Sequence, residues 1–123
     1  MNYVLLIYHH EASFAQLTKA ERNAVHRECG EWHAALERAG QTKGAAGLQP
    51  TSTATTLRVQ NGAVTLTDGP FAETKEALGG FELLECRNLD EALAIARAFP
   101  ALRFGSTVEL RPLVPGSDCT EPE

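Results

Sequence analysis

The sequence predicts an α+β fold of the ferredoxin-like type, a split βαβ arrangement with an extra hairpin strand. Short apolar, β-rich segments lie at residues 3–8, 81–86 and 106–111. Two segments with helical periodicity separate them, and the dipeptide Asn61-Gly62 favours a tight hairpin between two further strands. The order strand, helix, hairpin, strand, helix, strand predicts an antiparallel sheet with two helices on one face. The other face then needs cover, which sheet-to-sheet pairing of two copies would provide.

Length and composition are typical of a single soluble domain. The 123 residues are 43% hydrophobic and 22% charged, which suits one domain with its own core. We assign that domain to residues 1–114. Residues 115–123 have little apolar content, so we expect them to form a disordered tail. The net charge of −5, without a cluster of Lys or Arg, argues against direct binding to nucleic acid.

The cysteines and the first residues bear on location. Cys29, Cys86 and Cys119 fit neither a zinc motif nor a redox pair, so we expect free thiols in a reducing compartment. The apolar run near the N-terminus is too short for a signal peptide or a membrane span. Together these features predict a cytoplasmic protein without membrane contact.

Two adjacent histidines follow the first predicted strand, residues 3–8, which is typical of a buried central strand. His9 and His10 at a strand end can line a pocket, bind a metal or simply be solvated in a loop. A metal-dependent enzyme that uses both histidines together with Asp68 is one hypothesis. The chain has no compact ligand motif, however, so we expect no metal and no cofactor.

The first long helix is predicted to begin near Thr18, because Thr18-Lys19-Ala20-Glu21 matches a capping box. Gly40 suits the position just after a helix, so the helix should end at about residue 38 or 39. Its predicted core stripe consists of Val25, Cys29, Trp32, Leu36 and Ala39.

His26 and His33 each follow a position of that stripe and lie on the same edge of the apolar face, two turns apart. A histidine at such an edge can face a cleft between helix and sheet and act there as a general acid or base. Half-exposed helix residues without a function would show the same spacing.

The remaining elements follow from turn and cap signals. Residues 55–60 and 63–67 are β-rich and flank the hairpin dipeptide. Residues 41–53 are small and polar and predict at most a short, irregular strand. Asn88 is the predicted cap of the second helix, which Pro100 ends.

Residues 67–81 hold the densest set of special-backbone and titratable residues in the chain. As a pocket wall, this stretch would place Asp68 at a strand end, and its glycines would let a ligand approach closely. The candidates for ligand binding are Gly69, Pro70, Phe71, Glu73, Lys75, Gly79 and Gly80. The simpler interpretation is an elaborate connection between two strands, since Asp-Gly-Pro is common in turns.

The same stretch resembles the signature of the DGPF branch of the YCII-related family. The residues that carry the resemblance are Asp68-Gly69-Pro70-Phe71-Ala72-Glu73-Thr74-Lys75-Glu76, followed by Gly79-Gly80-Phe81. The similarity runs from about residue 3 to residue 112. It implies a dimeric α+β barrel in which two sheets face each other and each subunit keeps a cleft between sheet and helices. It implies no particular reaction, because most members of this branch have no established activity.

Two function hypotheses follow. The first is a cofactor-free enzyme of the lyase or isomerase type for a small polar molecule, with Asp68 as base or orienting carboxylate and His26 or His33 as its partner. Short members of the wider family are thought to pair a histidine of the first helix with an Asp soon after it, but residues 41–53 contain no acidic residue. The second is a noncatalytic binding or regulatory module, since DGPF proteins resemble partners encoded beside bacterial extracytoplasmic-function sigma factors. A hydrogen bond between Asp68 and either histidine would favour the first hypothesis.

Overall fold

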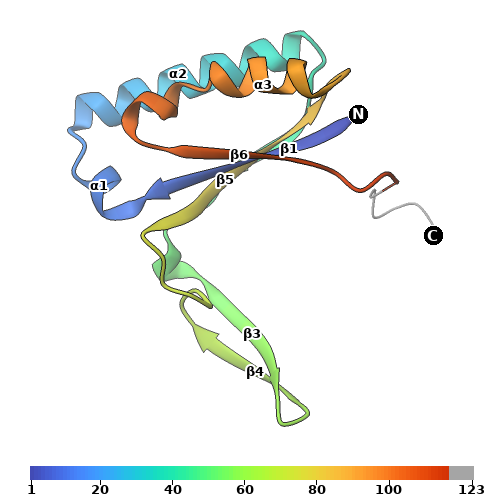
Figure 1. Cartoon of the computed structure of the whole chain (residues 1–123). Helices are drawn as coiled ribbons and strands as arrows, with labels where there is room; N and C mark the ends of the chain where they lie inside the picture. The colour runs from blue at the N-terminus through green and yellow to red at the C-terminus, as the bar shows by residue number, and fades with distance from the viewer. Residues whose placement is uncertain (117–123) are drawn as a thin grey trace.

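Four antiparallel strands form the main sheet of the computed structural model, which describes residues 1–116 (Figure 1). The strands are β1 (Asn2–His10), β2 (Thr42–Gly47), β5 (Glu76–Glu85) and β6 (Thr107–Pro112). Their spatial order is β2-β5-β1-β6, so β1 and β5 are central. The predicted α+β class is confirmed, and this strand order is compatible with a ferredoxin-like fold.

The helices cover one face of the main sheet. The long helix α2 (Lys19–Arg38) and the shorter α3 (Leu89–Arg97) lie on the same side, as predicted (Figure 1). A one-turn helix α1 (Glu11–Ala15) follows β1, and the 3-10 helix η2 (Pro100–Phe104) leads into β6. None of the helices described here is both long enough and apolar enough to cross a membrane.

Side-chain caps set the starts of both main helices. The Glu21 N–H donates to Thr18 Oγ1 at 3.1 Å, and the Thr18 N–H donates to the Glu21 carboxylate at 2.9 Å, which confirms the predicted capping box. Asn88 caps α3 by accepting a hydrogen bond from the Glu91 N–H at 3.0 Å. Both helices therefore begin where local sequence chemistry predicts.

The core lies between the helices and the sheet. Its main cluster consists of Tyr3, Leu5, Leu36, Leu84, Cys86, Ala92 and Ala96. The predicted stripe of α2 is largely right, because Val25 and Leu36 are buried and Trp32 packs against the core. Ala39 is the exception: it is the exposed C-cap of α2 rather than a core residue.

The predicted hairpin forms, but it is not part of the main sheet. Strands β3 (Thr55–Gln60) and β4 (Ala63–Asp68) pair only with each other, and Asn61 and Gly62 both adopt positive φ at the turn. We call residues 55–68 the arm. The arm projects from the body on the side away from the helices (Figure 1). The expected extra hairpin strand in the main sheet is thus wrong: the fourth strand is β2, which pairs with β5.

Residues 67–81, expected to form a wall of the pocket, belong to two strands and the loop between them. Asp68 ends β4, residues 69–75 form a loop, and β5 starts at Glu76. Gly79 and Gly80 therefore lie inside a strand, which corrects their expected place in a connection. Residues 117–123, most of the predicted tail, lie outside the described residues, and the dimeric barrel stays a prediction.

Candidate functional site

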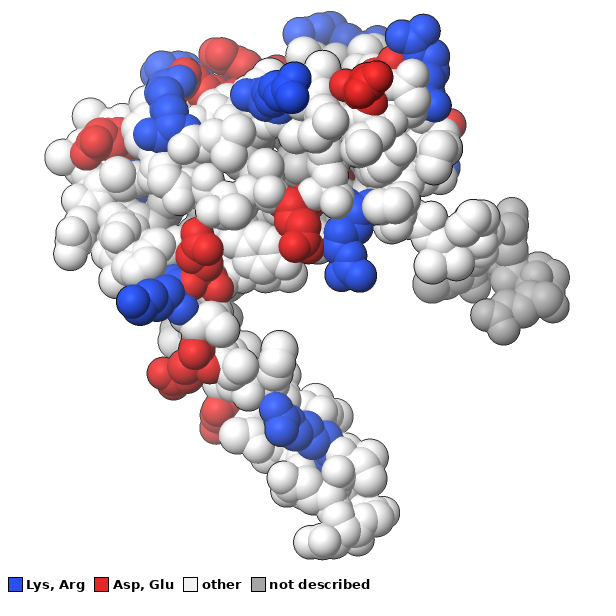
Figure 2. All heavy atoms as spheres, viewed as in Figure 1, with Lys and Arg blue, Asp and Glu red and all other residues white. Residues whose placement is uncertain are grey.

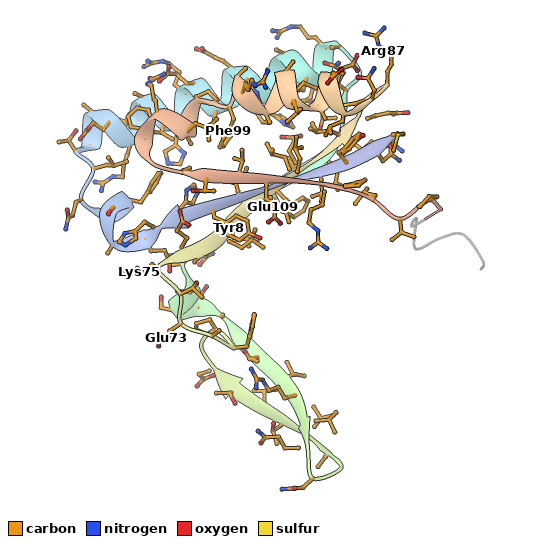
Figure 3. All side chains as sticks on the ribbon, in the orientation of Figure 1. Tyr8, Glu73, Lys75, Arg87, Phe99 and Glu109 are labelled. Atoms are coloured by element: carbon orange, nitrogen blue, oxygen red, sulfur yellow. The ribbon has the colours of Figure 1, made fainter. Side chains whose placement is uncertain are left out.

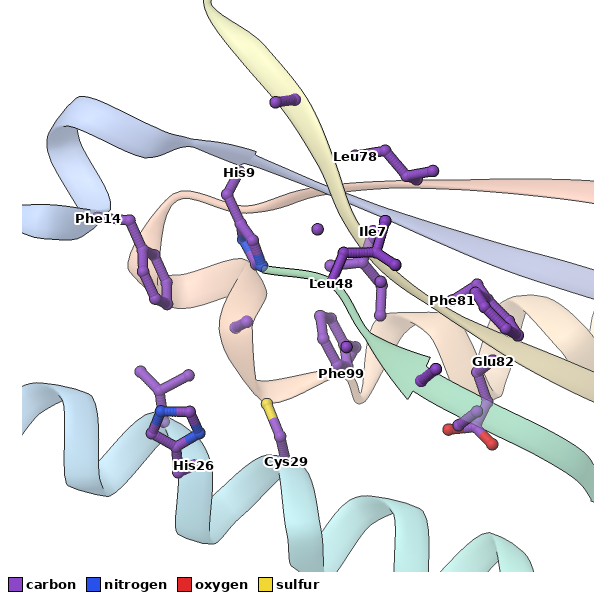
Figure 4. A pocket seen from close by; sticks show the side chains of 18 of the residues that line it. Ile7, His9, Phe14, His26, Cys29, Leu48, Leu78, Phe81, Glu82 and Phe99 are labelled. Atoms are coloured by element: carbon purple, nitrogen blue, oxygen red, sulfur yellow. The ribbon is translucent and has the colours of Figure 1, made fainter. Parts of the chain in front are cut away.

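A cavity of about 820 Å³ between α2 and the sheet is the candidate functional site (Figure 4). Most of its wall is apolar, with side chains from β1, α1, the segment after β2, and the turn after α3. Examples are Ile7, Phe14, Leu48, Phe99 and Ala101. Two groups of polar side chains contribute to the lining, His9 with Glu11 and His33 with Glu82. His26 and Gln49 also line the cavity. An apolar pocket with a few polar groups is the usual form of a site for a small molecule.

The ring of His9 enters this cavity from β1, which extends two residues beyond the predicted strand (Figure 4). Its Nδ1 lies 2.7 Å from Ser106 Oγ, and its ring stacks on Phe14 with centroids 4.6 Å apart. Gly79 of β5 leaves space for the ring, since a Cβ there would lie 2.2 Å from Cδ2 of His9. Burial lowers the pKa of His9, so its imidazole is mainly neutral near neutral pH.

Glu11, the first residue of α1, joins β1 to the segment that precedes the arm. Its carboxylate accepts hydrogen bonds from the N–H of Thr51 at 3.0 Å and from the Thr51 hydroxyl at 2.6 Å. Thr51 begins the 3-10 helix η1 (Thr51–Thr53). These hydrogen bonds lower the pKa of Glu11, while its negative charge raises the pKa of His9 and opposes part of the effect of burial. Glu11 thus fixes one wall of the cavity and adds negative charge near His9.

His33 and Glu82 form the second polar group. Glu82 is only 2% exposed, and its side chain lies on the face of β5 that is toward α2. Its two carboxylate oxygens lie 2.9 and 3.1 Å from His33 Nδ1, and the Thr42 hydroxyl donates to the same carboxylate. Glu37 lies 3.0 Å from His33 Nε2. The hydrogen bond from Glu82, with smaller effects of both carboxylate charges, raises the pKa of His33.

The predicted catalytic residues are only partly brought together. His26 and His33 line the cavity, whereas Asp68 ends the arm and is exposed. The structure does not bring Asp68 to either histidine: within residues 1–116, the partners of the His33 ring nitrogens are Glu82 and Glu37. His26 is exposed on α2, although it reaches the cavity rim (Figure 4).

The ligand-binding candidates also separate into two groups. Gly79 and Gly80 line the cavity from β5. The other candidates do not line it and lie in the loop between the arm and β5, where Figure 3 labels two of them; they are Gly69, Pro70, Phe71, Glu73 and Lys75. Of the predicted pocket wall, the part of the stretch that enters β5 lines this cavity, and the ligand-binding roles stay predictions.

His10, the second of the two adjacent histidines, has a structural role. Its Nδ1 accepts a hydrogen bond from the N–H of Ser13 at 3.2 Å and so caps α1. Among residues 1–116, no three His, Cys, Asp or Glu side chains are grouped as metal ligands.

Sequence reasoning missed Glu82 and Ser106. For Glu82 a signal existed, because a carboxylate within the apolar run Phe81-Glu82-Leu83-Leu84 needs a partner if the strand is covered. For Ser106 there was none, because nothing local relates this residue to His9. Only the pairing of β1 with β6 brings the two together.

Comparison with known proteins identifies the family of this chain. The YCII-related domain matches residues 1–115. The chain belongs to the YCII-related family. An uncharacterized protein of Rhizobium meliloti (strain 1021) is 40% identical to this YCII-related chain over 114 residues, which cover 92% of each chain. The predicted family is confirmed, whereas the DGPF branch of the YCII-related proteins stays a prediction.

Proposed function

We propose that this chain catalyses a proton transfer, of the isomerase or lyase kind, on a small molecule with a largely apolar body. One observation carries the proposal: the ring of His9 opens into an apolar cavity while Ser106 holds its other nitrogen. A base whose far side is oriented by a third group is a common arrangement in acid–base catalysis.

His9 suits the role of general base better than His33 does. When Nδ1–H of His9 donates to Ser106 Oγ, the lone pair of Nε2 is available to a bound molecule. The lowered pKa of His9 favours this neutral form. His33 has a raised pKa, which favours its charged form, and carboxylates contact both of its ring nitrogens, so neither nitrogen is available as a base. In this proposal His9 therefore takes the catalytic role that the sequence suggested for His26 or His33 with Asp68.

The lining of the cavity supports a proposal for the substrate class. Apolar walls such as Phe14, Leu48 and Phe99 suit a substrate with an aliphatic or aromatic body. The substrate proposed here is therefore more apolar than the small polar molecule expected from the sequence. Near His9 the substrate would carry an acidic C–H beside a carbonyl group. Nε2 would take this proton and then return it to another atom in an isomerase, or pass it to solvent as a leaving group departs in a lyase.

Hydrogen–deuterium exchange tests the proposal without knowledge of the product. The chain is incubated in D2O with a panel of ketones and lactones that have alkyl or aryl bodies, and the loss of each α-proton is followed by proton NMR. We expect exchange with at least one compound to be slower by about 100-fold or more in His9→Gln, the usual effect of removing a general base. We expect Ser106→Ala to lower the rate less, because this variant keeps the His9 base and removes only the hydroxyl that orients its ring.

The matched control is His10→Asn. This variant changes the adjacent histidine, keeps an acceptor for the cap of α1, and should exchange at the parent rate. Equal exchange in the parent and in His9→Gln would overturn the assignment of His9, and the absence of exchange throughout the panel would overturn the reaction class.

A noncatalytic binding module is the second candidate, and the mostly apolar lining of the cavity favours it. Such a module would bind a small apolar ligand and report it to a partner, as expected for a regulator linked to a sigma factor. Compounds that raise the melting temperature of the chain but undergo no exchange would support this candidate over the enzyme.

We also propose that the chain forms a homodimer through the face of the main sheet that the helices leave open. Three directly opposed apolar pairs support it, namely Val4 with Leu83, Leu6 with Phe81, and Tyr8 with Leu78. Burial of such a face is a common basis for stable association. Sedimentation velocity at several concentrations tests it, and a monomer at about 100 μM, far above the dissociation constants of stable dimers, would contradict it.

A further inference from the structure

The arm carries an apolar stripe on one of its faces. Cross-strand pairing places Leu57 opposite Leu66 and Val59 opposite Val64, and these four side chains alternate with polar ones along both strands. They are between 58% and 71% exposed. An isolated two-stranded hairpin is marginally stable in water, and exposed aliphatic side chains on it favour a partner.

The four side chains of the stripe are uncharged, and Asp68, on the same face of the arm, lies opposite Thr55 at its root. The one basic side chain within β3, Arg58, pairs with Thr65 and therefore lies on the opposite face of the arm. In the space-filling view the arm is mostly uncharged toward its tip, and acidic groups gather near its root (Figure 2). A partner surface for the stripe should therefore be apolar rather than charged.

The open face of the main sheet is such a surface. None of its six central apolar residues, the three opposed pairs between β1 and β5, belongs to the described core clusters, although Leu78 and Phe81 also contribute to the lining of the cavity. Charged residues on this face lie around the apolar pairs. Glu109 and Arg111 are on β6, opposite Leu6 and Val4. Glu76 and Glu85 are at the two ends of β5. Figure 3 shows Tyr8 and Glu109 on the side away from the helices, the side from which the arm also projects.

We infer that the arm docks on a second copy of this chain, with its stripe against the open sheet face of that copy. A single chain carries both the apolar stripe and an apolar face, and both are on the same side of the body. Two copies related by a two-fold axis can therefore exchange arms in one closed, self-complementary contact. This inference adds a second contact to the proposed sheet dimer and does not depend on the chemistry of the cavity.

The size of the contact also favours a role for the arm. With a strand spacing of about 4.8 Å and a rise of about 3.4 Å per residue, the four-stranded face has a footprint of roughly 400 Å². A standard interface buries about 800 Å² per subunit. The arm adds a footprint of roughly 200 Å² by the same measure. Side chains that project from both surfaces make the accessible area larger than these flat footprints. The sheet face and the arm together therefore approach the area that a stable dimer buries per subunit. The sheet face alone provides about half of that area.

The first experiment compares two charge-pair variants by sedimentation velocity. The double variant Val59→Glu with Val64→Lys places a cross-strand ion pair within the stripe. The matched control, Gln60→Glu with Ala63→Lys, places the same pair on the other face of the arm and leaves the net charge the same. We expect the parent and the control to be dimers. The dissociation constant of the stripe variant should be at least about 100-fold higher, because the contact would lose two valines that the proposed dimer buries.

The second experiment identifies what the arm touches. Leu66 is replaced by the photoreactive benzoylphenylalanine, and copies labelled with ¹⁵N are mixed with unlabelled copies before irradiation. We expect cross-links between chains from Leu66 to β1 or β5. A monomeric parent, an unchanged dissociation constant in the stripe variant, cross-links within one chain, or cross-links between two arms would each overturn the inference. Because neither readout uses activity, the inference can fail or hold apart from the proposed reaction.

Discussion

Nδ1 of His33 lies 2.9 Å from Oε1 of Glu82, so a helix and the middle of the sheet are joined by an ion pair beside the cavity. The Glu82 carboxylate is buried, and the Thr42 hydroxyl and His33 are its hydrogen-bond partners in the described chain. A buried carboxylate is costly unless it is paired and hydrogen-bonded. The pair therefore holds α2 on the sheet.

Replacing His33 with Ala should destabilise the fold, because the Glu82 carboxylate loses its charged partner but stays buried. Such a hydrogen bond to a charged group contributes roughly 2 kcal/mol, reduced here because a third of the His33 side chain is exposed. We expect the free energy of unfolding in urea to fall by about 1–2 kcal/mol. The variant Glu82→Gln should lose less, and a double-mutant cycle would isolate the pair. Fully additive effects in this cycle would show that the two residues do not interact.

The same pair should make stability depend on pH. Because the folded state raises the pKa of His33 above its ordinary value of 6.5, its contribution is fully present below 6.5 and is lost as pH rises through the raised value. His9 has a lowered pKa, so its contribution is present above 6.5 and is lost as pH falls. The useful measurement is thus the difference in unfolding free energy between the parent and His33→Gln. This difference should shrink as pH rises from 6.5 through the raised pKa of His33, and a constant difference would contradict the prediction.

Gly79→Ala should displace His9. The new Cβ would lie 2.2 Å from Cδ2 of the ring, which stacking on Phe14 and the hydrogen bond to Ser106 hold in place. We expect a loss of about 1–3 kcal/mol in stability, typical of overpacking. The ring signals of His9 in NMR spectra should also move, and any exchange activity should fall as in Ser106→Ala. Unchanged His9 signals would show that the ring tolerates the added methyl group.

Gly30→Ala should stabilise the chain. Gly30 lies inside α2, and a Cβ added there meets no other atom within 4 Å. Alanine in a helix interior is favoured over glycine by about 1 kcal/mol, so the melting temperature should rise by a few degrees. Gly40→Ala is the contrasting variant: Gly40 has φ of +68°, which alanine disfavours, so its melting temperature should fall.

The fold was predictable wherever the signal is local. The Thr18–Glu21 capping box and the Asn61-Gly62 turn are both present, because each depends on neighbouring residues. The place of the arm was not predictable, since a β-rich hairpin has the same pattern whether it extends a sheet or stands apart. Strand β2 was equally difficult, because a run of Gly and Ala gives no alternation of apolar and polar side chains.

The candidate site was predictable only in part, for the same reason. Asp68 was a reasonable base at a strand end, but it lies at the root of the arm and does not line the cavity. The contacts that matter, His9 with Ser106 and His33 with Glu82, join segments that are far apart in the sequence. Helix periodicity placed His33 at the correct edge, but no local pattern specifies its partner in the sheet.

The central position of β1 has a consequence for biosynthesis. Tyr3 pairs with Leu84 on one side and with Pro112 on the other, so β1, which is synthesised before the other strands of its sheet, pairs with the two strands that are synthesised last. Pairing between such distant segments slows folding. Until β6 is synthesised, the apolar residues of β1 are exposed on a nascent chain that cannot close its sheet. During that interval we expect the exposed strand to favour binding by chaperones, and a pause in translation before Thr107 should lengthen this exposure.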